Sequence, residues 1–181
     1  MNSGGAEHLR AEVRPADVAA VAALVAATGF FSAEEIAVAG ELVAERIARG
    51  AVSGYEFRFA DGAAGLAGYS CFGRIPLTQA SYDLYWIVVA PQLQGHGLGR
   101  RLLAASEAAV MAAGGRRLYA ETSSRPLYAP TRAFYRRCGY REAATLPDFY
   151  APGDGKVVFE RRLADDGRRM KRTRPFGQSV V

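Results

Sequence analysis

The most informative stretch of the chain is residues 85–103, which read YWIVVAPQLQGHGLGRRLL. An apolar strand ends, the backbone turns through glycines at positions 95, 97 and 99, and a helix begins. Glycine permits backbone dihedral angles and close approaches that a Cβ would block. The first amides of a helix lack intrahelical partners and lie at the positive end of its dipole, so they attract phosphate. The stretch therefore predicts an anion-binding loop, with positive charge added by Arg100 and Arg101.

Two common phosphate-binding motifs do not fit this loop. A dinucleotide fingerprint, G-x-G-x-x-G, would need a third glycine at the position that Arg100 occupies. A P-loop needs Lys and then Ser or Thr after its last glycine, but Gly99 precedes two arginines. The loop is therefore expected to bind a different phosphate-containing ligand.

Outside this loop, hydrophobic periodicity and turn residues predict one α+β domain. Strands are expected at 9–13, 55–60, 65–72, 81–89, 117–121, 141–144 and 156–162. Helices are expected at 15–28, 33–48, 98–111 and 130–138, the second beginning at a capping box formed by Ser32 and Glu35. Hairpins in the middle of this order and a βαβ unit across the glycine loop imply a partly antiparallel sheet with helices on its faces.

Length and composition exclude several classes of protein. The chain has 181 residues, 50% hydrophobic and 23% charged, which favours one folded domain and excludes a disordered chain. Its two cysteines, Cys71 and Cys138, lack the paired spacing of a zinc site. No apolar run is long enough to span a membrane and no secretory signal is visible, so we expect a cytoplasmic protein without a membrane partner.

The chain is expected to divide into a flexible N-terminus (1–8), a folded domain (9–163) and a basic C-terminal extension (164–181). The net charge is +5, and seven basic residues between Arg161 and Arg174 are opposed by only two acidic ones. No nucleic-acid-binding motif accompanies them, so we expect a solvated extension. A nucleic-acid adaptor is the most distant alternative, and a steep salt dependence of binding would reveal it.

Two blocks resemble the GNAT family of N-acetyltransferases. Residues 94–99, QGHGLG, match the family's pyrophosphate-loop signature, Gln/Arg-x-x-Gly-x-Gly/Ala. Residues 133–140, AFYRRCGY, are similar to its A-x-x-F-Y-x-x-x-G-F block, with a shorter spacing between Ala133 and Phe134. The stretch 121–150 also looks like a branch of these acetyltransferases. The order of elements agrees with the family from about Leu9 to Leu163.

The resemblance implies a GNAT-like, largely antiparallel sheet of six to seven strands, splayed between the fourth and fifth. It implies acetyl-CoA as the acetyl donor and no metal. It also implies a homodimer as an oligomeric state to be tested. The tyrosine at the position of Tyr135 lies by the coenzyme sulfur in this family, and an oxyanion would meet a backbone amide near residues 88–89. The residues expected to bind the coenzyme are Val88, Val89, Gln94, Gly95, His96, Gly97, Leu98, Gly99, Arg100 and Arg101.

The chemistry also needs a proton acceptor. An alkylamine with a pKa near 10.4 is mostly protonated at pH 7, and must lose a proton before it attacks a thioester. Asp83 is the first candidate base, and alternation along its strand predicts that it shares a face with Tyr85, Ile87 and Val89. Alternation also puts Tyr85 and Trp86 on opposite faces. Glu121, at the end of the next strand, is the rival base or a clamp for the substrate ammonium.

The acceptor pocket is expected between the first two helices and the loops after the fourth and fifth strands. Its candidate residues are Phe30, Phe31, Tyr55, Tyr85, Ser123 and Tyr128, which favour a small, partly apolar amine. Phe134 is expected in the core, His96 on the surface, and Cys138 as a small buried residue. Two further alternatives are a protein or peptide acceptor and a coenzyme A-binding module without turnover. An amine screen for thioester consumption would distinguish the module from the enzymes.

Overall fold

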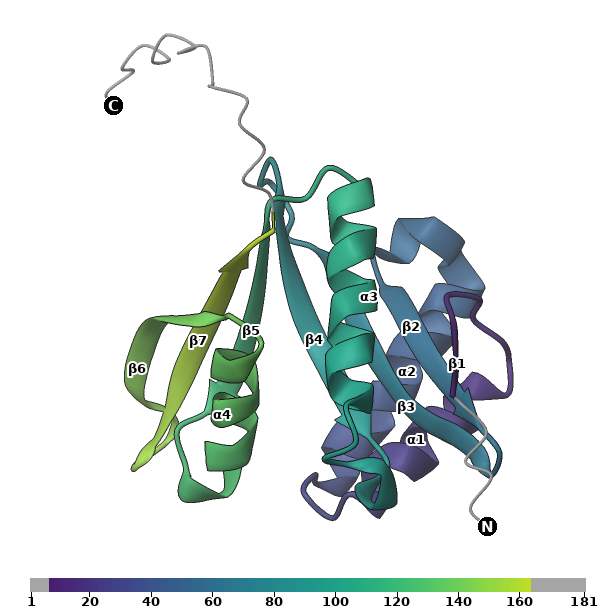
Figure 1. The fold of residues 1–181 in the computed structure, drawn as a ribbon, viewed down its shortest axis with the longest axis horizontal. Helices are drawn as coiled ribbons and strands as arrows, with labels where there is room; N and C mark the ends of the chain where they lie inside the picture. The colour runs from purple at the N-terminus through teal and green to yellow at the C-terminus, as the bar shows by residue number, and fades with distance from the viewer. Residues whose placement is uncertain (1–6, 164–181) are drawn as a thin grey trace, which may run out of the picture.

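The computed structural model describes residues 7–163 and shows one mixed sheet flanked by four α-helices (Figure 1). The strands are β1 (His8–Arg10), β2 (Glu56–Gly62), β3 (Gly65–Arg74), β4 (Ser81–Val89), β5 (Arg117–Ser123), β6 (Arg141–Ala151) and β7 (Asp154–Arg162). The helices are α1 (Asp17–Ala27), α2 (Ala33–Arg49), α3 (Leu98–Ala112) and α4 (Ala129–Arg137). The expected extension 164–181, and the first six residues of the expected N-terminus, lie outside the described residues.

The seven strands follow the order β1-β2-β3-β4-β5-β7-β6, and every neighbouring pair is antiparallel except β4 and β5. The parallel pairing joins Ser81–Leu84 only to Arg117–Ala120. Beyond these residues β4 and β5 diverge, as Figure 1 shows, and we call this point the fork. The expected splay between the fourth and fifth strands is therefore confirmed.

Helices cover the sheet on both faces (Figure 1). On one face, α1 and α2 pack on β2, β3 and β4 around residues such as Val25, Val43 and Phe59, which are fully buried. On the other face, α3 and α4 pack on β4, β5 and β7 around Leu103 and Phe159. We call these the α1/α2 face and the α3/α4 face.

Most sequence expectations agree with the structure, including the capping box, in which the Ser32 hydroxyl accepts from the Glu35 amide at 3.2 Å. The two outermost strands differ most. β1 has three residues where 9–13 was expected. β6 continues to Ala151, whereas the sequence predicted a strand only at 141–144. The prediction was too short because every residue of β6 is exposed, so no hydrophobic alternation marks its length. None of the helices within residues 7–163 is long and apolar enough to cross a membrane.

A β-bulge in β4 changes which side chains share a face. Cys71 of β3 pairs with Trp86, but the next residue of β3 pairs with Leu84, so Tyr85 is an extra residue in β4. Strict alternation is therefore broken there. Tyr85 packs on Tyr55 and Trp86 on Phe31, both on the α1/α2 side, so the expectation of opposite faces is wrong.

The same bulge corrects the expected surroundings of Asp83. Ile87 and Val89 pack on the α3/α4 face, beside Leu102. Leu84, next to Asp83, also packs on that face, so Asp83 points to the α1/α2 face with Tyr85. Asp83 and Tyr85 therefore share a face, as expected, but Ile87 and Val89 do not share it.

Gly68 sets the spacing between β3, β4 and α3. A Cβ at this position would lie 2.9 Å from both Leu102 Cδ1 and the backbone oxygen of Val88. We expect Gly68→Ala to lower the free energy of unfolding by about 1–3 kcal/mol, because backbone atoms must shift to admit the methyl group. Urea denaturation measures this loss. Ala63→Ser, in the exposed turn between β2 and β3, is the control and should change stability by less than about 0.5 kcal/mol.

Candidate active site

The glycine loop leads from β4 into α3 through backbone conformations that favour glycine. Gly95 has φ +79° and Gly97, the N-cap residue of α3, has φ +88°. The first intrahelical bond at this end runs from the Arg101 amide to the Gly97 oxygen at 3.1 Å. The amides of residues 98–100 are therefore without intrahelical partners at the positive end of the helix dipole. This arrangement has the geometry of the anion-binding loop that the sequence predicts.

The loop is held against β4 and α4. The Gln94 side-chain amide donates to the Val89 oxygen at 3.2 Å. A Cβ at Gly99 would lie 3.4 Å from the Phe134 ring and 3.7 Å from Val89 Cγ2. Phe134, which was expected in the core, is only partly buried and borders the loop as well as the packed residues below it. Gly99 thus allows the close approach of α3 to α4.

A cavity of about 580 Å³ opens between the glycine loop, the diverging half of β4 and α4. Beyond Leu84, β4 pairs with no strand of residues 7–163 on its β5 side, so one edge of its backbone faces this wedge. The cavity is lined by Thr28, Phe30, Phe31, Ile87, Val88, Val89, Gln94, Gly95, Gly97, Gly99, Arg100, Leu127, Tyr128, Pro130, Thr131, Phe134, Arg137 and Cys138.

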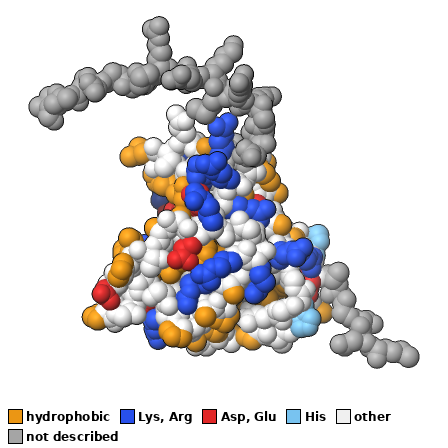
Figure 2. Space-filling model, turned by 60° about the vertical axis from the view of Figure 1, so that its left-hand side comes forward, with side chains coloured by type: hydrophobic (Ala, Val, Ile, Leu, Met, Phe, Trp, Pro, Cys, Tyr) orange, Lys and Arg blue, Asp and Glu red, His pale blue; other side chains and the backbone are white. Residues whose placement is uncertain are grey.

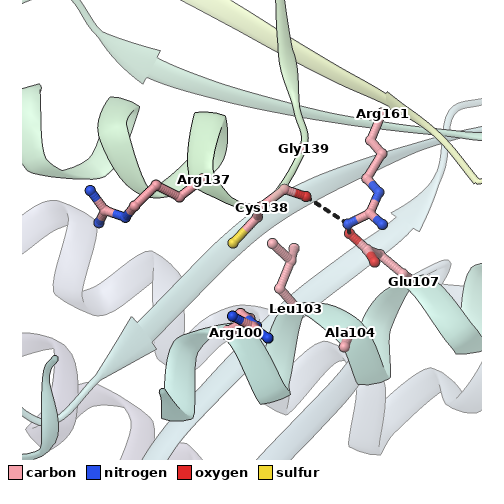
Figure 3. Close-up of a pocket in the computed structure, with 8 residues that line it drawn as sticks. All are labelled: Arg100, Leu103, Ala104, Glu107, Arg137, Cys138, Gly139 and Arg161. Atoms are coloured by element: carbon pink, nitrogen blue, oxygen red, sulfur yellow. Dashed lines mark hydrogen bonds and ion pairs between the residues drawn. The ribbon is translucent and has the colours of Figure 1, made fainter. Parts of the chain in front are cut away.

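A second cavity of about 390 Å³ adjoins the first and shares Arg100, Arg137 and Cys138 with it. Figure 3 shows Arg161 reaching from β7 toward Glu107 of α3 and toward the Cys138 carbonyl. Its Nη1 lies 3.0 Å from Glu107 Oε1 and 2.7 Å from the Cys138 oxygen. The two cavities together form one extended hollow along α3 and α4.

Arginines make this side of the molecule basic. Figure 2 shows a band of Lys and Arg side chains across it. Burial raises the pKa of Glu107, while Arg161 and the Tyr140 hydroxyl oppose this rise. Burial also raises the pKa of the Cys138 thiol, which favours its neutral form over a nucleophilic thiolate. Because Arg161 is engaged with Glu107, Arg100 and Arg137 are the exposed cations that line both cavities.

Three residues expected to bind the coenzyme lie away from the cavities. Arg101 turns outward, where its Nη1 lies 2.7 Å from Glu7 Oε2. The Leu98 side chain is buried under the sheet, so only its amide can face an anion. The His96 ring is exposed, as expected, and its Nδ1 lies 2.8 Å from the Gln94 oxygen.

Tyr135 follows Phe134 in α4, but it lies outside the lining of both cavities. Its side chain is 4% exposed, and its ring centroid lies 5.4–5.5 Å from those of Phe134, Tyr140 and Phe159. Burial raises the pKa of Tyr135 well above the usual range of a phenol. Tyr135 therefore keeps its proton at neutral pH, as a proton donor must.

Asp83 and Glu121 lie on either side of the fork, on the α1/α2 face. Asp83 pairs with Tyr119 across the two strands, and Glu121, two residues further along β5, shares the face of Tyr119. Burial raises the pKa of Asp83, the charge of Glu121 raises it further, and Lys156 opposes both. Glu121 is exposed and forms an ion pair with Lys156 at 2.7 Å. The two candidate bases are thus neighbours in different surroundings.

The six expected acceptor residues separate into three groups. Phe30, Phe31 and Tyr128 line the larger cavity. Tyr55 and Tyr85 pack together, with ring centroids 5.7 Å apart, outside the cavity lining on the α1/α2 face. The Ser123 hydroxyl is already engaged, since it donates to Asp154 and accepts from the Arg125 amide at 3.0 Å.

Sequence reasoning missed several residues of the site. Arg137 and Cys138 belong to the face of α4 that carries Phe134, and helical spacing from Phe134 could have identified them. Lys156 and Tyr150 reach Glu121 only because the β6–β7 hairpin folds back on β5. No local pattern indicates that contact. No group of three or more His, Cys, Asp or Glu side chains that could hold a metal occurs between residues 7 and 163.

A parallel strand pair that diverges above a helix N-terminus, with a glycine loop between, is typical of a site for a phosphate-containing ligand. Comparison with known proteins makes the class specific. The family profile of the GNAT acetyltransferase domain matches residues 24–142. The chain therefore belongs to the GNAT family of acetyltransferases.

Solved structures agree with this assignment. A Desulfovibrio desulfuricans protein assigned to the GNAT acetyltransferases shares 48% identity, with a TM-score of 0.86 over 88% of this chain and 100% of that one. YncA from Salmonella typhimurium, solved with acetyl-CoA, has 20% identity and a TM-score of 0.72 over 90% and 97%. An aminoglycoside 6'-N-acetyltransferase complexed with coenzyme A has 18% identity and a TM-score of 0.68 over 88% and 98%. None of the curated proteins matches the chain.

The chain is thus an N-acetyltransferase of this family. Its glycine cradle and extended basic hollow fit a long donor with a diphosphate.

Two adjacent arginines allow a matched test of the basic hollow. Arg100 lines both cavities, whereas Arg101 is paired with Glu7. We expect Arg100→Ala to weaken coenzyme A binding about tenfold, because a charge-assisted hydrogen bond contributes roughly 1.5 kcal/mol or more. Arg101→Ala should leave the affinity within about twofold of the wild type. Calorimetric titration at low salt measures both, and equal losses would contradict the assignment.

Proposed function

We propose that this acetyltransferase moves the acetyl group to the primary amine of a small metabolite or amino-acid-like acceptor. The observation that carries the proposal is the fork. The basic hollow lies on the α3/α4 face of the fork, and two carboxylates, Asp83 and Glu121, lie on its other face. An amine that approached the thioester from the carboxylate side would contact both a proton acceptor and the acetyl donor at the fork.

The chain's own residues would hold the donor along the hollow. The amides of residues 98–100 would bind the diphosphate, and Arg100 and Arg137 would add positive charge beside it. The unpaired edge of β4 near Val88 and Val89 would bind the pantetheine arm and supply an amide to the oxyanion. When bound, acetyl-CoA supplies the reactive thioester carbonyl.

The proton balance assigns roles to the remaining groups. The acceptor nitrogen arrives as an ammonium, forms the new N–C bond and loses two protons in all, while the C–S bond breaks. One proton passes to a carboxylate at the fork and then to solvent. The thiolate receives a proton from Tyr135, which is replaced from the nitrogen by way of solvent. The net products are the amide, the free thiol and one proton.

The chemistry of the acceptor side favours a cationic amine. Asp83 and Glu121 supply negative charge, and Phe30 and Tyr128 supply aromatic faces within 6.4 Å of each other. Carboxylates and aromatic faces both attract an ammonium group.

Both cysteines of the chain are unpaired, which supports our proposal of a reducing, cytoplasmic compartment.

Two tyrosine hydroxyls can be removed in parallel to test the proton donor. We expect Tyr135→Phe to lower kcat about 100-fold while coenzyme A affinity is retained, because only the proton to the leaving thiolate is lost. Tyr140→Phe is the matched control: its hydroxyl donates to Glu107 at 3.0 Å, so the change should reduce stability and leave kcat nearly unaltered. Steady-state kinetics measures both, and an unchanged kcat in Tyr135→Phe would remove this residue from the mechanism.

The acceptor class is tested with purified protein and acetyl-CoA. Free thiol is followed across small amines, amino acids and peptides with free N-termini or lysines. Turnover of small amines with little turnover of peptides is the expected result. Preferential turnover of peptides would identify a protein acetyltransferase. Tight coenzyme A binding with no transfer to any amine would instead identify a binding module.

A further inference from the structure

The ammonium of Lys156 occupies a defined position on the acceptor side. Its Nζ lies 2.7 Å from Glu121 Oε2 and 3.9 Å from the centroid of the Phe149 ring. The Lys156 side chain is 15% exposed, against 48% for Glu121. Lys156 is on β7, which pairs with β5 on one side and β6 on the other. The Lys156 ammonium thus connects β7 with both β5 and β6.

Asp83 lies on the other side of the fork from this ion pair. The charged and titratable groups that face it are Tyr85 from β4, Tyr119 and Glu121 from β5, and Lys156 from β7. Within residues 7–163, Asp83 forms no ion pair, whereas Glu121 has Lys156 as its partner. A proton that bound to Glu121 would have to break the 2.7 Å ion pair, but a proton that bound to Asp83 would break none.

We propose that Lys156 is a positioning residue that reserves the role of proton acceptor for Asp83 by holding Glu121 in an ion pair at the fork. This inference rests on the proposed function. Lys156 touches neither reacting atom in this scheme and acts through Glu121. Glu121 stays ionised, strengthens Asp83 as a base through its negative charge, and attracts the incoming ammonium. The two carboxylates therefore have different roles although they share one face.

The balance of charges predicts the effect of removing the ammonium. Burial and Glu121 raise the pKa of Asp83, and Lys156 is the group that lowers it. In Lys156→Met the lowering influence is lost, and two carboxylates face each other without a cation. A base must be deprotonated to act, so the acid limb of the pH profile of kcat/KM should move to higher pH by about one unit.

Two further variants distinguish this role from a purely structural one. Lys156→Arg keeps the positive charge and should leave the acid limb near its wild-type position. Lys156→Met combined with Glu121→Gln removes both opposing charges and should return the limb toward the wild-type position. If Lys156→Met lowered kcat/KM equally at every pH, with the limb unmoved, the proposal would be overturned.

A second measurement does not depend on turnover. The Asp83 carboxyl is followed by ¹³C NMR during a pH titration of the full chain, with its resonance assigned from Asp83→Asn. An upward shift of its midpoint in Lys156→Met, and little shift in Lys156→Arg, supports the electrostatic effect of Lys156 on Asp83 even if no amine is acetylated. In that case the proposed function alone fails. An unmoved midpoint in Lys156→Met overturns the inference even if the wild type is active.

Discussion

The fork between β4 and β5 is the constraint on which the rest of the site depends. Parallel pairing ends at Leu84 and Ala120, and the strands then separate although both remain bonded on their outer sides. Separation leaves one backbone edge of β4 without a strand partner, and buried backbone groups need partners. In this fold a ligand can meet that need. The strands that build the core thus also form the opening in which we propose that the chemistry takes place.

The position of α3 follows from the same opening. The chain leaves β4 at the wide end of the fork and enters α3 within a few residues, so the helix N-terminus faces the wedge. Positive φ angles at Gly95 and Gly97 make this short turn, and Gly99 lets α4 approach. The connection between β4 and α3 therefore has two effects. It places positive charge at the proposed diphosphate site, and it leaves the β4 edge open for the proposed pantetheine site.

Much of this arrangement could be predicted from the sequence, because its signals are local. The run from β4 through the glycines into α3 and the capping box at Ser32 are short patterns with a direct physical cause. The bulge at Tyr85 could not be predicted, since it depends on how β3 pairs with β4. Lys156 was missed because its contact with Glu121 joins strands 35 positions apart in the chain. For Arg101, the partner Glu7 lies at the far end of the domain.

The free edges of the sheet carry a consequence for self-association. β6 is outermost at one end, and its register with β7 shifts twice, between Glu142 and Ala144 and between Leu146 and Ala151. Pro147 has no amide hydrogen, and Asp148 has φ +52°, so a continuous ladder of donors and acceptors is interrupted. At the opposite edge of the sheet, β1 has three residues with which another strand could pair. Strand-to-strand docking between copies is therefore poorly templated at these two edges of the sheet.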